Sequence, residues 1–168
     1  MWTLEGLSEL TDADLLAGLS DQAAGVRENA VKPAESHSKK AALLPAILPL
    51  AKDADARVRF QTAFTLGEFS DASVIDALAT IAKHDATDPW IRTAARVALE
   101  WQPVETWRER ALAADAGLTV KLALARAGSD ADRAAIATAL PSFTGKSRAV
   151  QEELAHRMHE ASEKMEFE

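Results

Sequence analysis

The chain has 168 residues, 48% of them hydrophobic, a formal net charge of −7 and no cysteine. This length can bury one sizeable core, while the lack of cysteine excludes disulfides, zinc–thiolate sites and cysteine nucleophiles. The acidic balance argues against a large nucleic-acid footprint, because phosphate binding needs clustered lysines and arginines.

A short pattern recurs at a fixed period along the first hundred residues. Each copy joins an acid in a polar turn to a Val-Arg or Ile-Arg step that begins a helix, as in "KDADARVRFQTAFTLGEF" (52–69). The acids, 32 residues apart each time, are Asp21, Asp53 and Asp85, and the arginines are Arg27, Arg59 and Arg92. A period of this size is typical of a repeat architecture. We therefore predict helix pairs at about residues 11–37, 42–69 and 71–101.

The first two repeats carry recognisable helix boundaries. Residues 11–14 (Thr-Asp-Ala-Asp) predict the cap of the first helix. Pro33 is expected to shorten the second helix of the first repeat, and Pro49 to kink or end the first helix of the second repeat. The apolar residues of these segments follow the helical period, which favours amphipathic helices.

The third repeat is the most regular, and the chain diverges after it. Asp71 and Asp88 are predicted N-caps, and Pro89 fits the first turn of the second helix. Residues 103–168 predict divergent and capping helices, the last of them from about Ser147 to Met165. Since no Gly-, Ser- or Pro-rich linker divides the sequence, we predict a single domain over residues 1–168.

These repeats resemble a known family. The stretches "DQAAGVRENAV", "DADARVRFQTAFTLG" and "DATDPWIRTAA" are similar to HEAT-like repeats of the phycobilin lyase type. More narrowly, "LLPAILPLAKDADARVRFQTAFTLGE" resembles the HEAT segment of large multidomain bacterial dehydrogenase-like proteins, which carry a haem-binding tail. The resemblance implies an all-α fold, a right-handed α-solenoid of about three helix pairs plus C-terminal capping helices. Because the chain lacks the Cys-x-x-Cys-His haem motif, we expect no cofactor.

The resemblance also implies a role for the recurring acids and arginines. In HEAT-like proteins they form a ladder between repeats, and here Arg59 is expected to pair with Asp53 or Asp55. An Asp/Arg anion or substrate site is the alternative. Scaffolding is favoured because catalysis rarely needs three copies of one motif.

Two groups of polar residues could hold a metal or act as acid and base. In "EELAHRMHEASE" the residues on one predicted helix face are Glu152, His156, His159, Glu160 and Glu163. A solvated face of a capping helix explains them better, because they lie opposite an apolar stripe. His84, Asp85 and Asp88 form the second group, for which a capped turn is the stronger interpretation.

An apolar and aromatic stripe is the candidate binding surface. Phe60 and Phe64 occupy the helical phase of Thr93 and Val97 in the next repeat, and Trp101 continues the line. Exposed patches of this kind often mark interaction sites. The same residues could instead be core, and the sequence leaves both possibilities open.

The sequence therefore predicts a non-catalytic scaffold that binds a protein or peptide partner on its concave face. The alternative is a small hydrolase or lyase-type enzyme with a polar or metal-dependent site on the solenoid. We expect no nucleic-acid partner and no membrane partner. The N-terminal stretch "MWTLEGLSEL" shows no signal-peptide pattern, so a cytoplasmic location is expected by default.

Overall fold

The computed structural model describes residues 10–35, 40–113 and 116–139, which form helices and short connections with no strand among them. Two 3₁₀ turns, η1 (Lys32–Glu35) and η2 (Leu48–Lys52), follow the helices α3 and α4. The helices are α2 (Asp12–Leu19), α3 (Ala24–Val31), α4 (Lys40–Ile47), α5 (Ala56–Gly67), α6 (Ala72–His84), α7 (Pro89–Glu100), α8 (Val104–Leu112), α9 (Leu118–Ala127) and α10 (Asp130–Ala139). The predicted all-α solenoid is confirmed.

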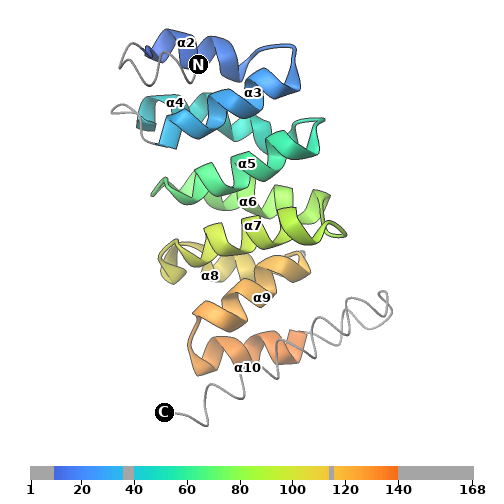
Figure 1. Cartoon of the computed structure of the whole chain (residues 1–168). Helices are drawn as coiled ribbons and strands as arrows, with labels where there is room; N and C mark the ends of the chain where they lie inside the picture. Colours follow the sequence, from blue (N-terminus) through green and yellow to red (C-terminus); the bar gives the residue numbers. More distant parts are fainter. Residues whose placement is uncertain (1–9, 36–39, 114–115, 140–168) are drawn as a thin grey trace, which may run out of the picture.

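The helices stack as pairs in two layers (Figure 1). One layer is the row of second helices, in which α5 packs between α3 and α7, and α9 packs on α7. The other contains the first helices, with α6 packed on η2 and on α8. The pair α8 and α9 continues both layers, so the stack extends beyond the three repeats that the sequence showed clearly. We call the layer of α3, α5, α7 and α9 the second-helix layer.

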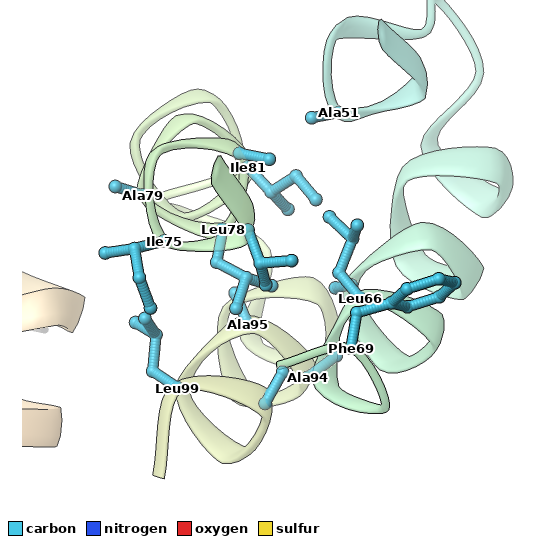
Figure 2. Packing of buried hydrophobic residues seen from close by; sticks show 14 of the residues in the cluster. Ala51, Leu66, Phe69, Ile75, Leu78, Ala79, Ile81, Ala94, Ala95 and Leu99 are labelled. Carbon is cyan, nitrogen blue, oxygen red and sulfur yellow. The ribbon is translucent and has the colours of Figure 1, made fainter. Parts of the chain in front are cut away.

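Small residues let neighbouring helices approach closely. Gly67 of α5 lies so near α7 that an added Cβ would be 3.1 Å from Ala98 Cβ. Figure 2 shows Leu78 and Ile81 of α6 directed toward Leu66 of α5, with the α7 alanines beneath them. Because each pair leaves an apolar face for the next pair to cover, the buried core runs continuously through the stack.

The predicted effects of Pro33 and Pro49 on the early helices are confirmed. α3 ends at Val31, and Pro33 lies in the 3₁₀ turn η1 after it. α4 ends at Ile47, and Pro49 lies in η2. A proline inside an α-helix removes one backbone hydrogen bond and clashes with the preceding turn. The 3₁₀ turns are how the chain accommodates that conflict.

The predicted N-caps are present as well. Thr11 and Asp14 form a reciprocal capping box at the start of α2. Asp71 accepts a hydrogen bond of 2.9 Å from the Ser73 amide. Asp88 accepts from the amides of Trp90 (2.9 Å) and Ile91 (3.0 Å). The final predicted helix and the single-domain prediction for residues 1–168 depend on residues beyond the described part and stay predictions.

Candidate functional site

The recurring acids and arginines form bidentate bridges between consecutive repeats. Arg27 donates through Nε to Asp53 Oδ2 (2.6 Å) and through Nη2 to Asp53 Oδ1 (2.8 Å). Arg59 does the same with Asp85, at 2.7 and 2.5 Å. Planar guanidinium and carboxylate groups suit this paired geometry, which is stronger than a single contact. The ladder between repeats is therefore present at these two steps.

Each arginine also holds the turn that precedes its own helix. Arg59 Nη1 donates to the backbone oxygens of Asp53 (2.7 Å) and Ala54 (3.1 Å). Arg27 Nη1 makes the equivalent bonds to Asp21 and Gln22 at 2.8 and 2.9 Å. The expected side-chain partner of Arg59, Asp53 or Asp55, was wrong: Arg59 meets only the backbone of Asp53, and its carboxylate partner is Asp85 in the next repeat.

The ladder carboxylates are held in the ionised form. Hydrogen bonds from Arg27, followed by the Asp55 amide at 2.9 Å, keep the pKa of Asp53 below its usual value. Burial would raise the pKa of Asp85, but hydrogen bonds from Arg59 and His84 outweigh it, so that pKa is also lowered. The carboxylates of Asp53 and Asp85 therefore stabilise the contacts between repeats.

In the later repeats, the residue after Ile91 or Val120 also contacts the backbone of the preceding turn, but the contact differs. Arg92 Nη1 lies 3.4 Å from the backbone oxygen of Ala86, in the turn before α7. In α9 the Val-Arg step becomes Val120-Lys121, and the buried Lys121 donates through Nζ to the backbone oxygen of Ala113 at 2.8 Å. The sequence pattern missed this copy because lysine replaces arginine and the spacing from Ile91 to Val120 is shorter than in the earlier repeats.

The described residues that were considered for metal binding or acid–base chemistry make structural contacts instead. His84 Nδ1 lies 3.4 Å from Asp85 Oδ2, while Asp88 caps α7. Among the residues that the structure describes, no group of three or more His, Cys, Asp or Glu could hold a metal ion. The predicted candidates outside the described residues are Glu152, His156, His159, Glu160 and Glu163.

The apolar stripe lies on the outer side of the second-helix layer. Phe60 and Phe64 are half-buried and meet edge to face, with ring centroids 5.1 Å apart and planes at 79°. Val97 is also half-buried. Trp101 is 55% exposed, and its ring lies against Gly67, where an added Cβ would be 2.9 Å from Trp101 Cε3. The two phenylalanines are therefore neither full core nor free surface.

Trp90 extends this stripe and was missed from the sequence. It is 75% exposed, the highest fraction among the exposed large hydrophobic residues of the described chain. It precedes Val97 by seven residues and Trp101 by eleven, spacings that place all three on one face of α7. The equivalent residues Arg57 and Gly25 are not apolar, so comparing the repeats gave no signal for it. We call Phe60, Phe64, Trp90, Val97 and Trp101 the aromatic patch.

Stacked helix pairs joined by arginine–carboxylate bridges define an α-solenoid repeat protein. The family model for HEAT repeats matches residues 13–100, and the chain belongs to the HEAT-repeat family. No curated protein and no solved structure matches the chain. HEAT repeats typically act as protein-interaction scaffolds. Within the described residues, no helix is long and apolar enough to cross a membrane.

Proposed function

We propose that this protein is a non-catalytic scaffold that binds a protein or peptide partner through the aromatic patch. The observation that carries the proposal is the exposure of Trp90 and Trp101, 75% and 55%, on one face of α7. Exposed tryptophan side chains are costly to leave in water, and tryptophan is enriched among the residues that dominate binding energy. The patch lies on the outer side of the second-helix layer, the side we propose to be concave.

The surroundings of the patch support an interface. At the phase of Phe64, the first repeat presents Lys32 and the fourth presents Arg126, and both residues are exposed. Interfaces commonly have an apolar centre with a polar rim that excludes water. The edge-to-face phenylalanine pair is fixed against the core, so a partner would meet a centre whose side chains have already lost much of their rotational freedom.

The enzyme alternative, a hydrolase or lyase-type activity at a polar or metal-dependent site, has less support. Among the described carboxylates that the sequence pattern indicated, Asp53 and Asp85 bridge repeats, Asp88 caps α7, and Asp21 accepts a hydrogen bond from the Ala23 amide at 2.7 Å. Asp53 and Asp85 could exchange protons or bind a metal only by giving up their bridges between repeats. Metal analysis and a hydrolase panel with and without chelator would detect such an activity.

The narrower resemblance to the phycobilin lyase type, and to the HEAT segment of multidomain bacterial dehydrogenase-like proteins, stays a prediction. It is compatible with the proposed scaffold, because a HEAT segment that contacts neighbouring domains also needs an apolar contact face. The family match to HEAT repeats supports the coarser statement only.

The test compares capture of partners by the wild type, a Trp90→Ser/Trp101→Ser variant and a Leu112→Ser control. Leu112 is also exposed but lies on α8 in the other layer. Surface substitutions usually change stability by less than about 0.5 kcal/mol, so all three proteins should remain folded by circular dichroism. We expect the tryptophan variant alone to lose specific partners in quantitative mass spectrometry. Equal capture by all three would exclude the patch as the binding site.

A further inference from the structure

Two arginines lie on the outer side of the second-helix layer, on opposite sides of the aromatic patch. Arg57 is in the first turn of α5 and its side chain is 68% exposed. Arg126 is in the last turn of α9 and its side chain is 51% exposed. Although the chain is acidic overall, a partner that approaches the patch diagonally therefore meets a cation at each end.

Both arginines are held loosely by carboxylates that lie deeper. Arg57 Nε is 3.8 Å from Glu28 and 3.4 Å from Asp55, and Arg126 Nε is 3.6 Å from Glu100. The exposed fractions of Glu28 and Glu100 are 34% and 18%, well below those of their arginines. Exposed pairs of this geometry contribute little to stability.

Arg57 and Arg126 differ from the buried arginines of the ladder because a partner can reach them. Arg59 is buried in a bidentate bridge at 2.5–2.7 Å and is not accessible to a partner. Glu100 also accepts a 2.5 Å hydrogen bond from Arg96, so it stays paired when Arg126 turns outward. The outer arginines can therefore exchange their present contacts for a better-placed carboxylate at small cost.

We propose that the partner is a protein segment with acidic residues on both sides of an apolar or aromatic centre. Its carboxylates would bind Arg57 and Arg126, and its centre would pack on Phe60, Trp90 and Val97, which lie nearest the diagonal between the two arginines. This inference rests on the proposed function and adds the chemistry of the ligand. Charge complementarity at the rim of an interface sets specificity and association rate more than total affinity.

The stack also sets the length of the segment. Val58 and Val120 are equivalent positions in their repeats. Arg57 precedes Val58 by one residue and Arg126 follows Val120 by six, so the two arginines differ by seven positions along the helix direction. Seven positions correspond to about 10 Å along the helices, and α5 and α9 are two helix spacings apart, about 16–20 Å. The diagonal is about 21 Å, which six or seven extended residues span. The two acidic groups of the segment are thus expected about that far apart.

A single-stranded nucleic acid is the competing ligand, because bases stack on tryptophan and phosphates bind arginine. The net charge of −7 opposes it. The carboxylates of Glu28 and Glu100 behind the two arginines would also repel a continuous phosphate backbone. A segment with carboxylates only at its two ends brings far fewer negative charges to these carboxylates than a backbone with one phosphate per nucleotide, which favours the protein ligand.

The experiment selects random peptides of about twelve residues, displayed on phage, on the whole chain. We expect enriched peptides to carry Asp or Glu six or seven positions apart around an aromatic or leucine centre. A synthetic enriched peptide should bind the Arg57→Glu/Arg126→Glu variant at least about tenfold more weakly than the wild type at low salt. Its affinity for the wild type should fall as salt rises. A Lys83→Glu control, an exposed cation on α6 in the other layer, should bind like the wild type.

The outcomes separate this inference from the function on which it rests. Enriched peptides without paired acids that still require Trp90 and Trp101 would overturn the acidic-segment inference and retain the binding site. Peptides unaffected by Trp90→Ser/Trp101→Ser, or no enriched peptide at all, would count against the site itself. An oligothymidine that binds more tightly than the best peptide would assign the patch to nucleic acid instead.

Discussion

Replacing Arg59 with alanine tests the contribution of the inter-repeat ladder to stability. The substitution removes the bidentate bridge to Asp85 and two hydrogen bonds to the backbone of the preceding turn. It also leaves the Asp85 carboxylate buried without its main partner. Breaking a buried ion pair from one side typically costs about 3–5 kcal/mol. We expect a loss of that size in the free energy of unfolding.

Arg57→Ala is the matched control, because Arg57 lies two residues away on the same helix and is exposed. Its ion pairs are of the kind that contributes about 0–1 kcal/mol. Urea unfolding followed by circular dichroism at 222 nm measures both variants against the wild type. The total free energy of unfolding of a domain of this kind is about 5–15 kcal/mol, so the Arg59 variant should unfold at a clearly lower urea concentration. In a solenoid, a weakened interface between repeats should also broaden the transition.

A double variant shows whether the loss comes from the unpaired charge. Arg59→Leu/Asp85→Leu replaces the bridge with apolar groups, and such replacements are often neutral or stabilising when they pack well. It should therefore recover much of the stability lost in Arg59→Ala. If Arg59→Ala and Arg57→Ala lose the same free energy, the bridge contributes nothing beyond an exposed pair and the reasoning is wrong.

Three further outcomes follow from the same geometry. Because the pKa values of Asp53 and Asp85 are lowered in the folded state, their stabilisation is complete above their ordinary pKa of about 3.9 and is lost as the pH falls through the folded values. Urea midpoints should therefore drop steeply below about pH 4, and a flat profile down to pH 3 would contradict this. Asp88→Ala removes the cap of α7 and should cost about 0.5–2 kcal/mol in the same assay, whereas Asp88→Asn should cost less. Gly67→Ala places a methyl group against Trp101 and α7 and should cost about 1–3 kcal/mol. Unchanged tryptophan fluorescence and stability in that variant would show that α5 and α7 separate easily.

The sequence identified which residues form the ladder, but it did not predict which acid each arginine binds. A fixed period identifies Asp53, Arg59 and Asp85 as equivalent parts of successive repeats. It does not say which acid an arginine at the start of a helix reaches. That choice depends on how closely and at what tilt α5 and α7 stack, and small residues such as Gly67 and Ala98 set this distance far along the chain from the charges.

For the aromatic patch, the sequence predicted the side of the helix that its phenylalanines occupy, but not how exposed they are. Helical spacing places Phe60 and Phe64 on one side of α5, whatever covers that side. Their half-burial depends on the neighbouring helices of the layer, which the spacing within one helix cannot report. Trp90 escaped notice because comparison between repeats highlights shared features, whereas a binding residue is commonly one in which a single repeat departs from the others.

Arg57 and Arg59 lie on one helix but differ in role: Arg59 stabilises the stack, whereas Arg57 is proposed to contact a partner. They are the same residue type two positions apart, and the helical turn of about 100° per residue directs them to nearly opposite sides. Arg59 faces the next repeat and fixes the turn before α7, while Arg57 faces outward beside the aromatic patch. Because the patch draws residues from both α5 and α7, its shape depends on the bridge that Arg59 makes with Asp85. The ladder would therefore hold the proposed binding surface in shape without touching a ligand, and a weakened bridge should reduce affinity for the proposed partner through lost preorganisation.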